Sequence, residues 1–423
     1  MLNFPLPEEE GLRVRAETRT RSLVLRTPTQ EPTMISSAAL RGILADWSFW
    51  DKEPPDTHVR MVNLPKSLHT DLVLIIQGVR RSGKSTLLTQ LPKRYGLPLS
   101  QCTYCNFEDP RLLGDLNYRV LSQIVTEARK GHSADVPCYF FFDEIQNVEH
   151  WEKWLHTQLE RPGKNYFVLT GSNSCLLGGE FATALTGRHL TLELFPFSYA
   201  EYHSLFPKRE LKDYLLSGGF PKPLSFDAPK KLLQEYFNDI ILRDVLKRVH
   251  SRHPESIQQV AQMVFESCGS EVSFRKIAAV TGLTVDTVKS YLMACEQAYL
   301  LFQCPYFAYS EKKRALRNKK YYPIDSGLRH AVVSVTGSDL GKSLELLVFI
   351  TLKKSYQQVY FWSEIHKGEV DFVVRDGKSI IPYQVTLIKP EARHEIALDH
   401  FFKAFPDASD PKIITLDNAH EYL

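Results

Sequence analysis

The sequence predicts an α/β protein with a parallel sheet in its N-terminal half. Short apolar runs alternate with helical patterns over residues 38–194, which is typical of strand–helix–strand units. The run "LVLIIQ" leads directly into the glycine-rich stretch "GVRRSGKST", which begins at Gly78. The run "CYFFFDE" ends in two carboxylates, Asp143 and Glu144. Together these features predict a site for a phosphate-bearing ligand at one edge of the sheet.

The chain has 423 residues, of which 43% are hydrophobic and 24% charged. That length favours two or three domains, and the composition is typical of soluble globular proteins. No window approaches the roughly 18 consecutive apolar residues of a membrane helix. The N-terminus lacks a charged and then apolar leader. We therefore expect a cytoplasmic protein without a membrane partner, and the net charge of +3 indicates no partner by itself.

The seven cysteines are scattered, and several lie in apolar runs. This pattern favours reduced, buried thiols over a disulfide framework. Cys102 and Cys105 in "CTYC" have the spacing of zinc ligands, but no second Cys/His pair follows close by. A zinc site and a pair of buried thiols are the two interpretations of this motif.

Five segments follow one another along the chain. Residues 1–37 form an arm rich in Pro, Arg and Thr, and residues 38–196 form the α/β core. Residues 197–268 have mostly helical patterns, residues 269–325 contain a helix-turn-helix pattern, and residues 326–423 return to helix and then strand patterns. The core strands are predicted at residues 72–77, 101–106, 138–143, 166–170 and 189–194.

The stretch of residues 78–85 matches the pattern G-x-x-x-x-G-K-[ST] of phosphate-binding loops. It stands between a buried strand and an amphipathic helix, where backbone N–H groups and a helix N-terminus surround phosphates. Lys84 is expected to neutralise phosphate oxygens and Ser85 to bind Mg²⁺. The candidate nucleotide-binding residues here are Gly78, Arg81, Ser82, Gly83, Lys84, Ser85 and Thr86. Arg80 and Arg81 have three open roles, at phosphates, at acids of the core or at a neighbouring subunit.

Asp143 and Glu144 follow a fully apolar strand, so both emerge at the edge where α/β sheets bind ligands. Asp143 is expected to hold Mg²⁺ through water, and Glu144 to polarise the attacking water as a general base. A glutamate directly after the aspartate favours hydrolysis over transfer to another substrate. The alternative is a pair of solvated acids at a strand end.

Several stretches resemble the predicted AAA+ superfamily ATPases of bacteria and archaea. They are "GVRRSGKST", "FFFDEIQNVEHWEKWL", "LTGSNSCLL", "TGRHLTLELFPFSYAEY" and "SGGFPKPL", and later "KKYYPIDSGLRHAV", "GKSLELLVFITL", "VYFWSEIHKGEVDFVV" and "IPYQVTLIKP". The resemblance covers nearly the whole chain after about residue 38. It implies an AAA+ P-loop core (38–196), a helical lid (197–268), a winged-helix domain (269–325) and a C-terminal α/β domain similar to PD-(D/E)xK nucleases and restriction endonucleases (326–423). It implies no settled biological role.

In the AAA+ layout, the strand at residues 166–170 lies between the strands that precede Gly78 and Glu144. Ser172 or Asn173, which follow that strand, is then expected to contact the γ-phosphate, and capping of the next helix is the alternative. Arg188 stands where AAA+ proteins carry the arginine finger that reaches a neighbouring subunit's nucleotide. A solvated loop arginine is the alternative.

The nuclease-like domain lacks part of the nuclease pattern. Glu345 on a predicted helix and Asp371 on a predicted strand are the candidate carboxylates. Gln384 and Thr386 stand where the pattern needs Glu and Lys, and a glutamine brings no charge to a hard cation. We therefore expect a nuclease fold that does not cleave.

Two stretches are candidates for nucleic-acid contact. Thr287 and Lys289 are expected to face outward from the second helix of the helix-turn-helix. The stretch "SEKKRALRNKKYY" places cations next to tyrosines, which suits a groove that follows a nucleic-acid backbone. Its candidates are Lys312, Lys313, Arg314, Arg317, Lys319 and Lys320. A packing module and a solvated β-wing are the alternatives. A third stripe, which includes Arg243, suits DNA contact and a nucleotide sensor equally.

The leading hypothesis is an ATP- and Mg²⁺-dependent ATPase that assembles as a homo-oligomer, a hexameric ring, and acts on DNA. Branched recombination or repair intermediates are its candidate substrates. The second hypothesis is an ATP-dependent signalling or defence switch that acts through a protein partner. The third is an ATP-gated nuclease, against which Gln384 and Thr386 argue.

Overall fold

The structure is a computed structural model that describes residues 34–161, 163–172, 185, 187–249, 253–334 and 339–423. Within it, residues 35–423 form one compact unit. Two sequence predictions lie wholly or mostly outside the described residues: the sensor role of Asn173, and the arm over residues 1–37, of which only residues 34–37 are described.

A five-stranded sheet forms the centre of the N-terminal half. Its strands are parallel and lie in the order β2-β3-β4-β1-β5. They are β1 (Val73–Gln77), β2 (Cys102–Asn106), β3 (Cys138–Asp143), β4 (Asn165–Gly171) and β5 (His189–Glu193). Each predicted core strand is confirmed, with its ends shifted by at most one residue. β4 lies between β3 and β1, as the resemblance implies.

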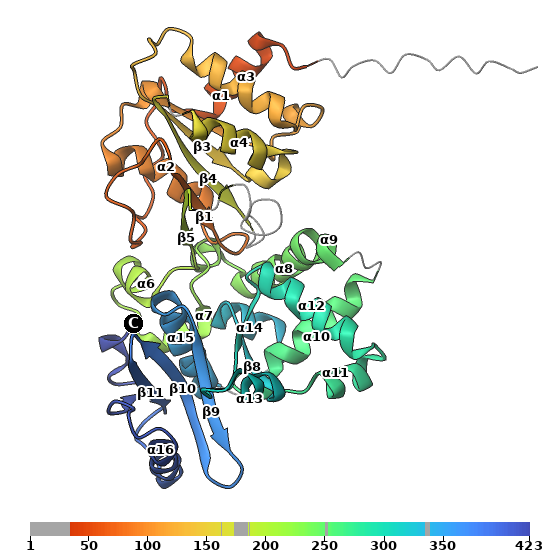
Figure 1. Ribbon diagram of the computed structural model, residues 1–423, viewed down its shortest axis with the longest axis vertical. Helices are drawn as coiled ribbons and strands as arrows, with labels where there is room; N and C mark the ends of the chain where they lie inside the picture. Colours follow the sequence, from red (N-terminus) through yellow and green to blue (C-terminus); the bar gives the residue numbers. More distant parts are fainter. Residues whose placement is uncertain (1–33, 162, 173–184, 186, 250–252, 335–338) are drawn as a thin grey trace, which may run out of the picture. The chain divides into compact units, whose positions relative to one another are not determined.

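Helices cover both faces of this sheet (Figure 1). On one face, α1 (Ser37–Trp47), α3 (Tyr118–Arg129) and α4 (Trp151–Glu160) share a hydrophobic core with the strands. On the other face, α2 (Lys84–Tyr95) packs its leucines against the intervening strand residues. Because successive strand side chains point to opposite sides, the strands β1, β3 and β4 are buried on both faces along most of their length.

Cys102 and Cys105 lie on β2 and are both buried. Cys102 packs in the core on the α2 side, and Cys105 packs in the core on the other side. Residues three apart on a strand point in opposite directions, so these two thiols cannot bind one zinc ion. They are buried thiols, and burial raises the pKa of Cys102 to about 12.

The segment after the sheet is helical, as its sequence pattern predicts. Its helices are α6 (Tyr199–Leu205), α7 (Leu211–Ser217), α8 (Pro229–Asp239), α9 (Leu246–Val249) and α10 (Pro254–Glu266). α8 continues into α9 through a π-helical segment, Ile240–Val245. α6 begins with a capping box between Ser198 and Glu201, which satisfies N–H groups at its first turn.

The predicted helix-turn-helix is formed by α11 (Phe274–Thr281) and α12 (Val285–Gln297). Gly282 ends α11 with a φ of 71°, in the left-handed region that favours glycine. Of the apolar positions on α12, Val288, Leu292 and Cys295 are buried, and Val285 is partly buried. An antiparallel sheet in the order β6-β8-β7 accompanies the two helices. Its strands are β6 (Glu271–Val272), β7 (Leu301–Cys304) and β8 (Lys319–Pro323), and α13 (Glu311–Leu316) precedes β8.

The C-terminal part contains a four-stranded sheet in the order β12-β11-β10-β9. Its strands are β9 (Val359–Glu364), β10 (Gly368–Asp376), β11 (Ser379–Val385) and β12 (Lys412–Ile414), and its helices are α14 (Ser326–Val332), α15 (Leu340–Ser355) and α16 (Ala392–Ala404). Short 3-10 turns occur at Leu99–Gln101, Pro110–Leu112, Ile145–Asn147, Lys222–Ser225 and Ala419–Glu421. Among the described residues, every helix is too short or too polar to cross a membrane.

Candidate functional site

The phosphate loop, residues 78–85, joins β1 to α2. At Gly78, a Cβ would come within 2.1 Å of the carbonyl oxygen of Leu194. At Gly83, which precedes α2, φ is 97° and favours glycine. Gly78 is therefore required because the backbone of Leu194 lies so close to it, and Gly83 is required by its own backbone conformation. Ser85 and Thr86 follow in the first turn of α2, where helix N–H groups attract an anion.

Lys84 is a buried ammonium at the centre of this loop. Its Nζ donates to the carbonyl oxygens of Gly78 and Val79, at 3.0 and 3.1 Å. Burial lowers the pKa of Lys84, which the carboxylates of Glu144 and Asp143 only partly offset. The distance from Lys84 Nζ to Glu144 Oε1 is 3.9 Å. An anionic ligand next to this ammonium would stabilise its charged form.

Asp143 ends β3 and is completely buried. Its carboxylate accepts hydrogen bonds from the hydroxyls of Tyr104, at 2.8 Å, and of Thr170. Burial and the nearby charge of Glu144 raise the pKa of Asp143, against the hydrogen bonds from Thr170, Ser85 and Tyr104. A cation at this carboxylate would reverse that shift, and carboxylate and hydroxyl oxygens are ligands that Mg²⁺ prefers.

Glu144 follows with a φ of 55°, in the left-handed region that side chains rarely adopt. Its N–H donates to the Thr170 hydroxyl at 3.0 Å. The amide of Gln146 donates to its Oε2, and the same amide lies 3.5 Å from the Ser172 hydroxyl. A strained conformation held by neighbouring contacts is typical of a functional position. Here it brings the carboxylate to the ammonium of Lys84.

Asp244, on the π-helical segment, connects three parts of the site. Its carboxylate accepts from the Ser172 hydroxyl at 3.1 Å and from Arg80 Nε at 3.0 Å. Arg80 also donates to Glu108 at 3.2 Å. Of the three open roles of Arg80, the structure supports pairing with acids. Arg81 is half exposed, and its Nη2 lies 3.8 Å from Asp239 of α8.

The Asp244 contacts give a test of stability. We expect Asp244→Asn to lower the free energy of unfolding by about 1–3 kcal/mol, because the largely buried Arg80 loses its ionic partner. The matched change Asp239→Asn removes a more exposed partner and should cost at most about 0.5 kcal/mol. Urea unfolding of the three proteins measures both values. Equal losses in the two variants would contradict the role assigned to Asp244.

A cavity of about 520 Å³ opens beside Gln146 and Ser172. The basic residues Arg243, Lys247 and Arg248 line it together with Arg80. Arg243 Nε lies 3.5 Å from Asp239, and Arg248 donates to the carbonyl oxygen of Asp244. The predicted basic stripe thus lies next to Ser172, which follows β4.

Arg188 lies at the start of β5, where its carbonyl oxygen accepts from the N–H of Val73 at 3.1 Å. Val73 begins β1, whereas the phosphate loop follows the other end of that strand. Five strand residues span about 16 Å. Arg188 therefore lies at the opposite end of the sheet from the phosphate loop of its own chain. A role for it at a nucleotide requires a second copy.

The four candidates of the predicted nuclease-like domain meet in one cavity. Glu345, Asp371, Gln384 and Thr386 all line a space of about 530 Å³. Asp371 Oδ2 accepts from Gln384 Nε2 at 2.6 Å and from the N–H of Val385 at 2.7 Å. Burial and the charge of Glu345 raise the pKa of Asp371 well above its usual range.

Lys320 lies among the carboxylates of Glu345, Glu369 and Asp371. Its prediction from the sequence as a nucleic-acid contact is wrong. Its side chain is fully buried. Its Nζ pairs with Glu369 and lies 3.7 Å from Glu345. Burial alone would lower the pKa of Lys320, but the carboxylates of Glu345, Glu369 and Asp371 outweigh it and raise the pKa. A buried ammonium held by two carboxylates cannot meet a phosphate backbone.

The remaining nucleic-acid candidates lie in different environments. Lys289, Lys312 and Lys313 are exposed, and Lys289 lies 3.3 Å from Asp286. Thr287 belongs to the N-terminal cap of α12. Two arginines bind the chain itself, Arg314 through the Tyr360 hydroxyl at 3.0 Å and Arg317 through the Ser363 carbonyl at 2.9 Å. Lys319 donates to Gln303.

Three comparisons with known proteins bear on this site. A family model for an AAA domain matches residues 70–203, and two domains of unknown function, DUF8612 and DUF4143, match residues 208–339 and 340–422. An uncharacterized protein of Haemophilus influenzae is 31% identical over 77% of this chain and 85% of its own length. An uncharacterized protein of Methanocaldococcus jannaschii is 31% identical over 82% and 80%. The structure of AMPPCP-bound DnaA from Aquifex aeolicus overlaps 62% of this chain and 89% of that chain, with 12% identity and a TM-score of 0.26, which is too low to carry an argument.

Proposed function

The chain belongs to the same family as these uncharacterized proteins and contains an AAA domain, and from that premise we propose that it is a Mg²⁺-dependent ATPase. The observation that carries the proposal is the cluster of Lys84, Asp143 and Glu144 beside the phosphate loop. One buried ammonium and two carboxylates at the C-terminal edge of a parallel sheet suit the binding and hydrolysis of a nucleoside triphosphate.

The residues of the cluster fit ATP with Mg²⁺. Lys84 is a buried ammonium with a lowered pKa, so phosphate oxygens would stabilise its charge. Asp143 is a buried carboxylate with a raised pKa, so it gains from a cation, and Ser85 would supply a second oxygen. Mg²⁺ bound there would neutralise charge that develops on the phosphate oxygens.

Glu144 would take the proton of the attacking water. Its Oε1 faces Lys84 at 3.9 Å, and its Oε2 is held by the amide of Gln146. Thr170 fixes both acids at once, because its hydroxyl donates to Asp143 and accepts from the Glu144 N–H. Ser172 would report on the γ-phosphate, since its hydroxyl is bound to Asp244 and lies within reach of Gln146.

We further propose that the protein works as a homo-oligomer, a hexameric ring in the leading hypothesis. The position of Arg188 at the far end of the sheet supports this, because only another subunit's nucleotide could use its guanidinium. Such an arginine would meet charge that develops during hydrolysis in the neighbouring site.

DNA is the proposed substrate, with branched intermediates as candidates. The packing of α11 and α12 beside the β6-β8-β7 sheet supports a winged helix. Lys289, Lys312 and Lys313 supply exposed cations for phosphate contact. In the nuclease-like domain, Lys320 already pairs with the carboxylates of its cavity, which supports a role other than cleavage.

Replacing Lys84 tests the ATP site. We expect Lys84→Ala to weaken ATP binding by about 10- to 100-fold, because a charged donor to the phosphates is lost. Lys93→Ala, on the exposed side of the same helix, should bind ATP like the wild type. Titration with a fluorescent ATP analogue measures both affinities. Equal affinity in all three proteins would overturn the assignment of the phosphate loop.

The DNA proposal is tested by the ATPase rate with duplex, forked and four-way DNA at low and high salt, with the product strands run on a denaturing gel. We expect branched DNA to raise the rate, a weaker effect at high salt, and intact strands. An ATPase rate that none of the DNA structures changes would instead favour the signalling switch with a protein partner. Cut strands would overturn the non-cleaving role.

A further inference from the structure

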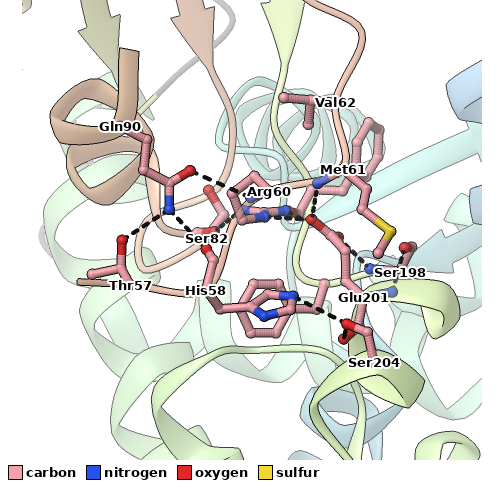
Figure 2. A network of polar contacts seen from close by, with 12 residues as sticks. Thr57, His58, Arg60, Met61, Val62, Ser82, Gln90, Ser198, Glu201 and Ser204 are labelled. Carbon is pink, nitrogen blue, oxygen red and sulfur yellow. Dashed lines mark hydrogen bonds and ion pairs between the residues drawn. The ribbon is translucent and has the colours of Figure 1, made fainter. Parts of the chain in front are cut away.

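Arg60 is a buried guanidinium on the irregular segment between α1 and β1. Figure 2 shows it between Ser82 on one side and Glu201 on the other. Each of its three nitrogens has a partner. Nη1 donates to the Ser82 carbonyl at 2.8 Å, Nη2 to the Phe195 carbonyl at 2.8 Å, and Nε to Glu201 Oε1 at 2.7 Å. It thus joins the phosphate loop, the chain after β5 and helix α6.

The pair with Glu201 is charged on both sides. Glu201 also accepts from the N–H groups of Met61 and Ser198, each at 2.8 Å. Burial alone would raise the pKa of Glu201, but the hydrogen bond and charge of Arg60 and these N–H groups outweigh it, so the pKa is lowered. A carboxylate that accepts from a guanidinium and from two backbone N–H groups keeps its charge, and it helps to orient that guanidinium.

The backbone of Arg60 is fixed to α2, the helix that follows the phosphate loop. Gln90 accepts from the Arg60 N–H at 3.3 Å, and its amide donates to the His58 carbonyl at 2.7 Å (Figure 2). Arg94 donates to the Arg60 carbonyl at 2.9 Å. Helix α2 therefore holds the segment from which the guanidinium reaches back to the loop.

The contact with Ser82 determines how one peptide group of the loop is turned. The peptide between Ser82 and Gly83 is planar and trans, so its carbonyl and its N–H point in opposite directions. Arg60 holds the carbonyl on the outer side of the loop. The N–H of Gly83 must then point to the inner side, where backbone N–H groups surround a phosphate. The guanidinium also lies close to Gly83, since a Cβ there would be 3.4 Å from Arg60 Nη1.

We propose that Arg60 is a positioning residue for the nucleotide: it never touches ATP, but it turns the Gly83 N–H toward the phosphates. The proposal rests on the proposed ATPase function. Because the same guanidinium binds Glu201 at the first turn of α6, it also ties the loop to the helices that follow the sheet.

The test must separate positioning from stability, because Arg60→Met alone leaves Glu201 buried without its partner. We expect this variant to melt at a lower temperature and to bind ATP about 10-fold more weakly, as for the loss of one well-placed donor. The double variant Arg60→Met/Glu201→Gln removes both charges. It should recover most of the melting temperature and none of the ATP affinity. Glu201→Gln alone keeps the guanidinium but removes the charge that orients it, so it should weaken ATP binding less than Arg60→Met does.

Steady-state rates give a second readout. In the double variant, KM for ATP should rise about 10-fold with kcat within about threefold of the wild type, because the lost contact acts on binding. Recovery of affinity together with melting temperature would overturn the proposal, since Arg60 would then serve the fold alone. An Arg60→Met variant with wild-type affinity would overturn it as well. A wild type that binds no ATP would overturn the ATPase proposal itself, and this one with it.

Discussion

Glu144→Gln is expected to slow ATP hydrolysis by about 10²- to 10⁴-fold, because glutamine keeps the shape of the general base without its ability to take a proton. ATP affinity should stay within about threefold of the wild type, since the change acts on the transition state rather than on binding. Single-turnover hydrolysis of labelled ATP measures the rate, and a filter-binding assay measures the affinity.

The matched control is Glu149→Gln. Glu149 follows β3 in the sequence, as Glu144 does, but it is exposed, and its variant should hydrolyse ATP at the wild-type rate. The pair of measurements separates two roles for Glu144. If the rate and the affinity fell together, Glu144 would serve mainly as the partner of Lys84 and not as the base.

Lys320→Met has the largest expected effect on stability. The variant leaves Glu345, Glu369 and Asp371 without their ammonium, and breaking a buried ion pair costs about 3–5 kcal/mol. Chemical unfolding measures the loss. Lys312→Met, an exposed lysine of the same basic stretch, should change the free energy of unfolding by at most about 0.5 kcal/mol. Equal small losses would show that Lys320 does not hold the cluster together.

The stability lost in Lys320→Met should depend on pH. A carboxyl whose folded pKa is raised, such as Asp371, contributes stability that is full below its unfolded pKa of about 3.9 and is lost as pH rises through the folded value. Burial already raises the pKa of Glu369, and removing the ammonium raises it further. The stability lost in Lys320→Met should therefore be larger near about pH 8 than near about pH 5.5. An equal loss at both pH values would contradict this charge assignment.

Much of the nucleotide site could be predicted because its signals are local. The phosphate loop is one contiguous motif, and the strand before Asp143 is apolar from end to end. The contacts of Thr170 required the strand order, since β4 brings this hydroxyl to the end of β3. The resemblance implied that strand order, but only the structure shows that Thr170 is the residue whose side chain contacts Asp143 and Glu144.

The prediction of Lys320 as a surface cation was wrong. The residues that precede it in the basic stretch are exposed or half-buried, and Lys320 itself is buried. Lys320 is the second residue of β8, in which successive side chains point to opposite faces. Lys320 shares a face with the buried Tyr322, whose hydroxyl donates to Glu345 at 2.7 Å. Tyr321 and Tyr322 point to opposite faces and both are buried, so the pattern of "KKYYP" does not show which of the two lysines points inward.

Arg60 and Glu201 carry no such signal. They are 141 residues apart, and the segment around Arg60 has neither helical nor strand periodicity. A buried ion pair of this kind forms only when two segments that are distant in the sequence come into contact, and no local pattern in a single sequence predicts that contact. The same reason applies to Asp244, which is 164 residues from Arg80.

The π-helical segment Ile240–Val245 has a geometric consequence for Asp244. A π-helical turn contains an extra residue compared with an α-helix and is less stable for that reason. If the segment returned to α-helical spacing by a one-residue slip, everything after it would rotate by about 100° around the helix axis. Asp244 would leave Arg80 and Ser172, and Lys247 and Arg248 would turn with it. Such a slip would therefore separate Asp244 from Arg80 of the phosphate loop and move Lys247 and Arg248 in the same step.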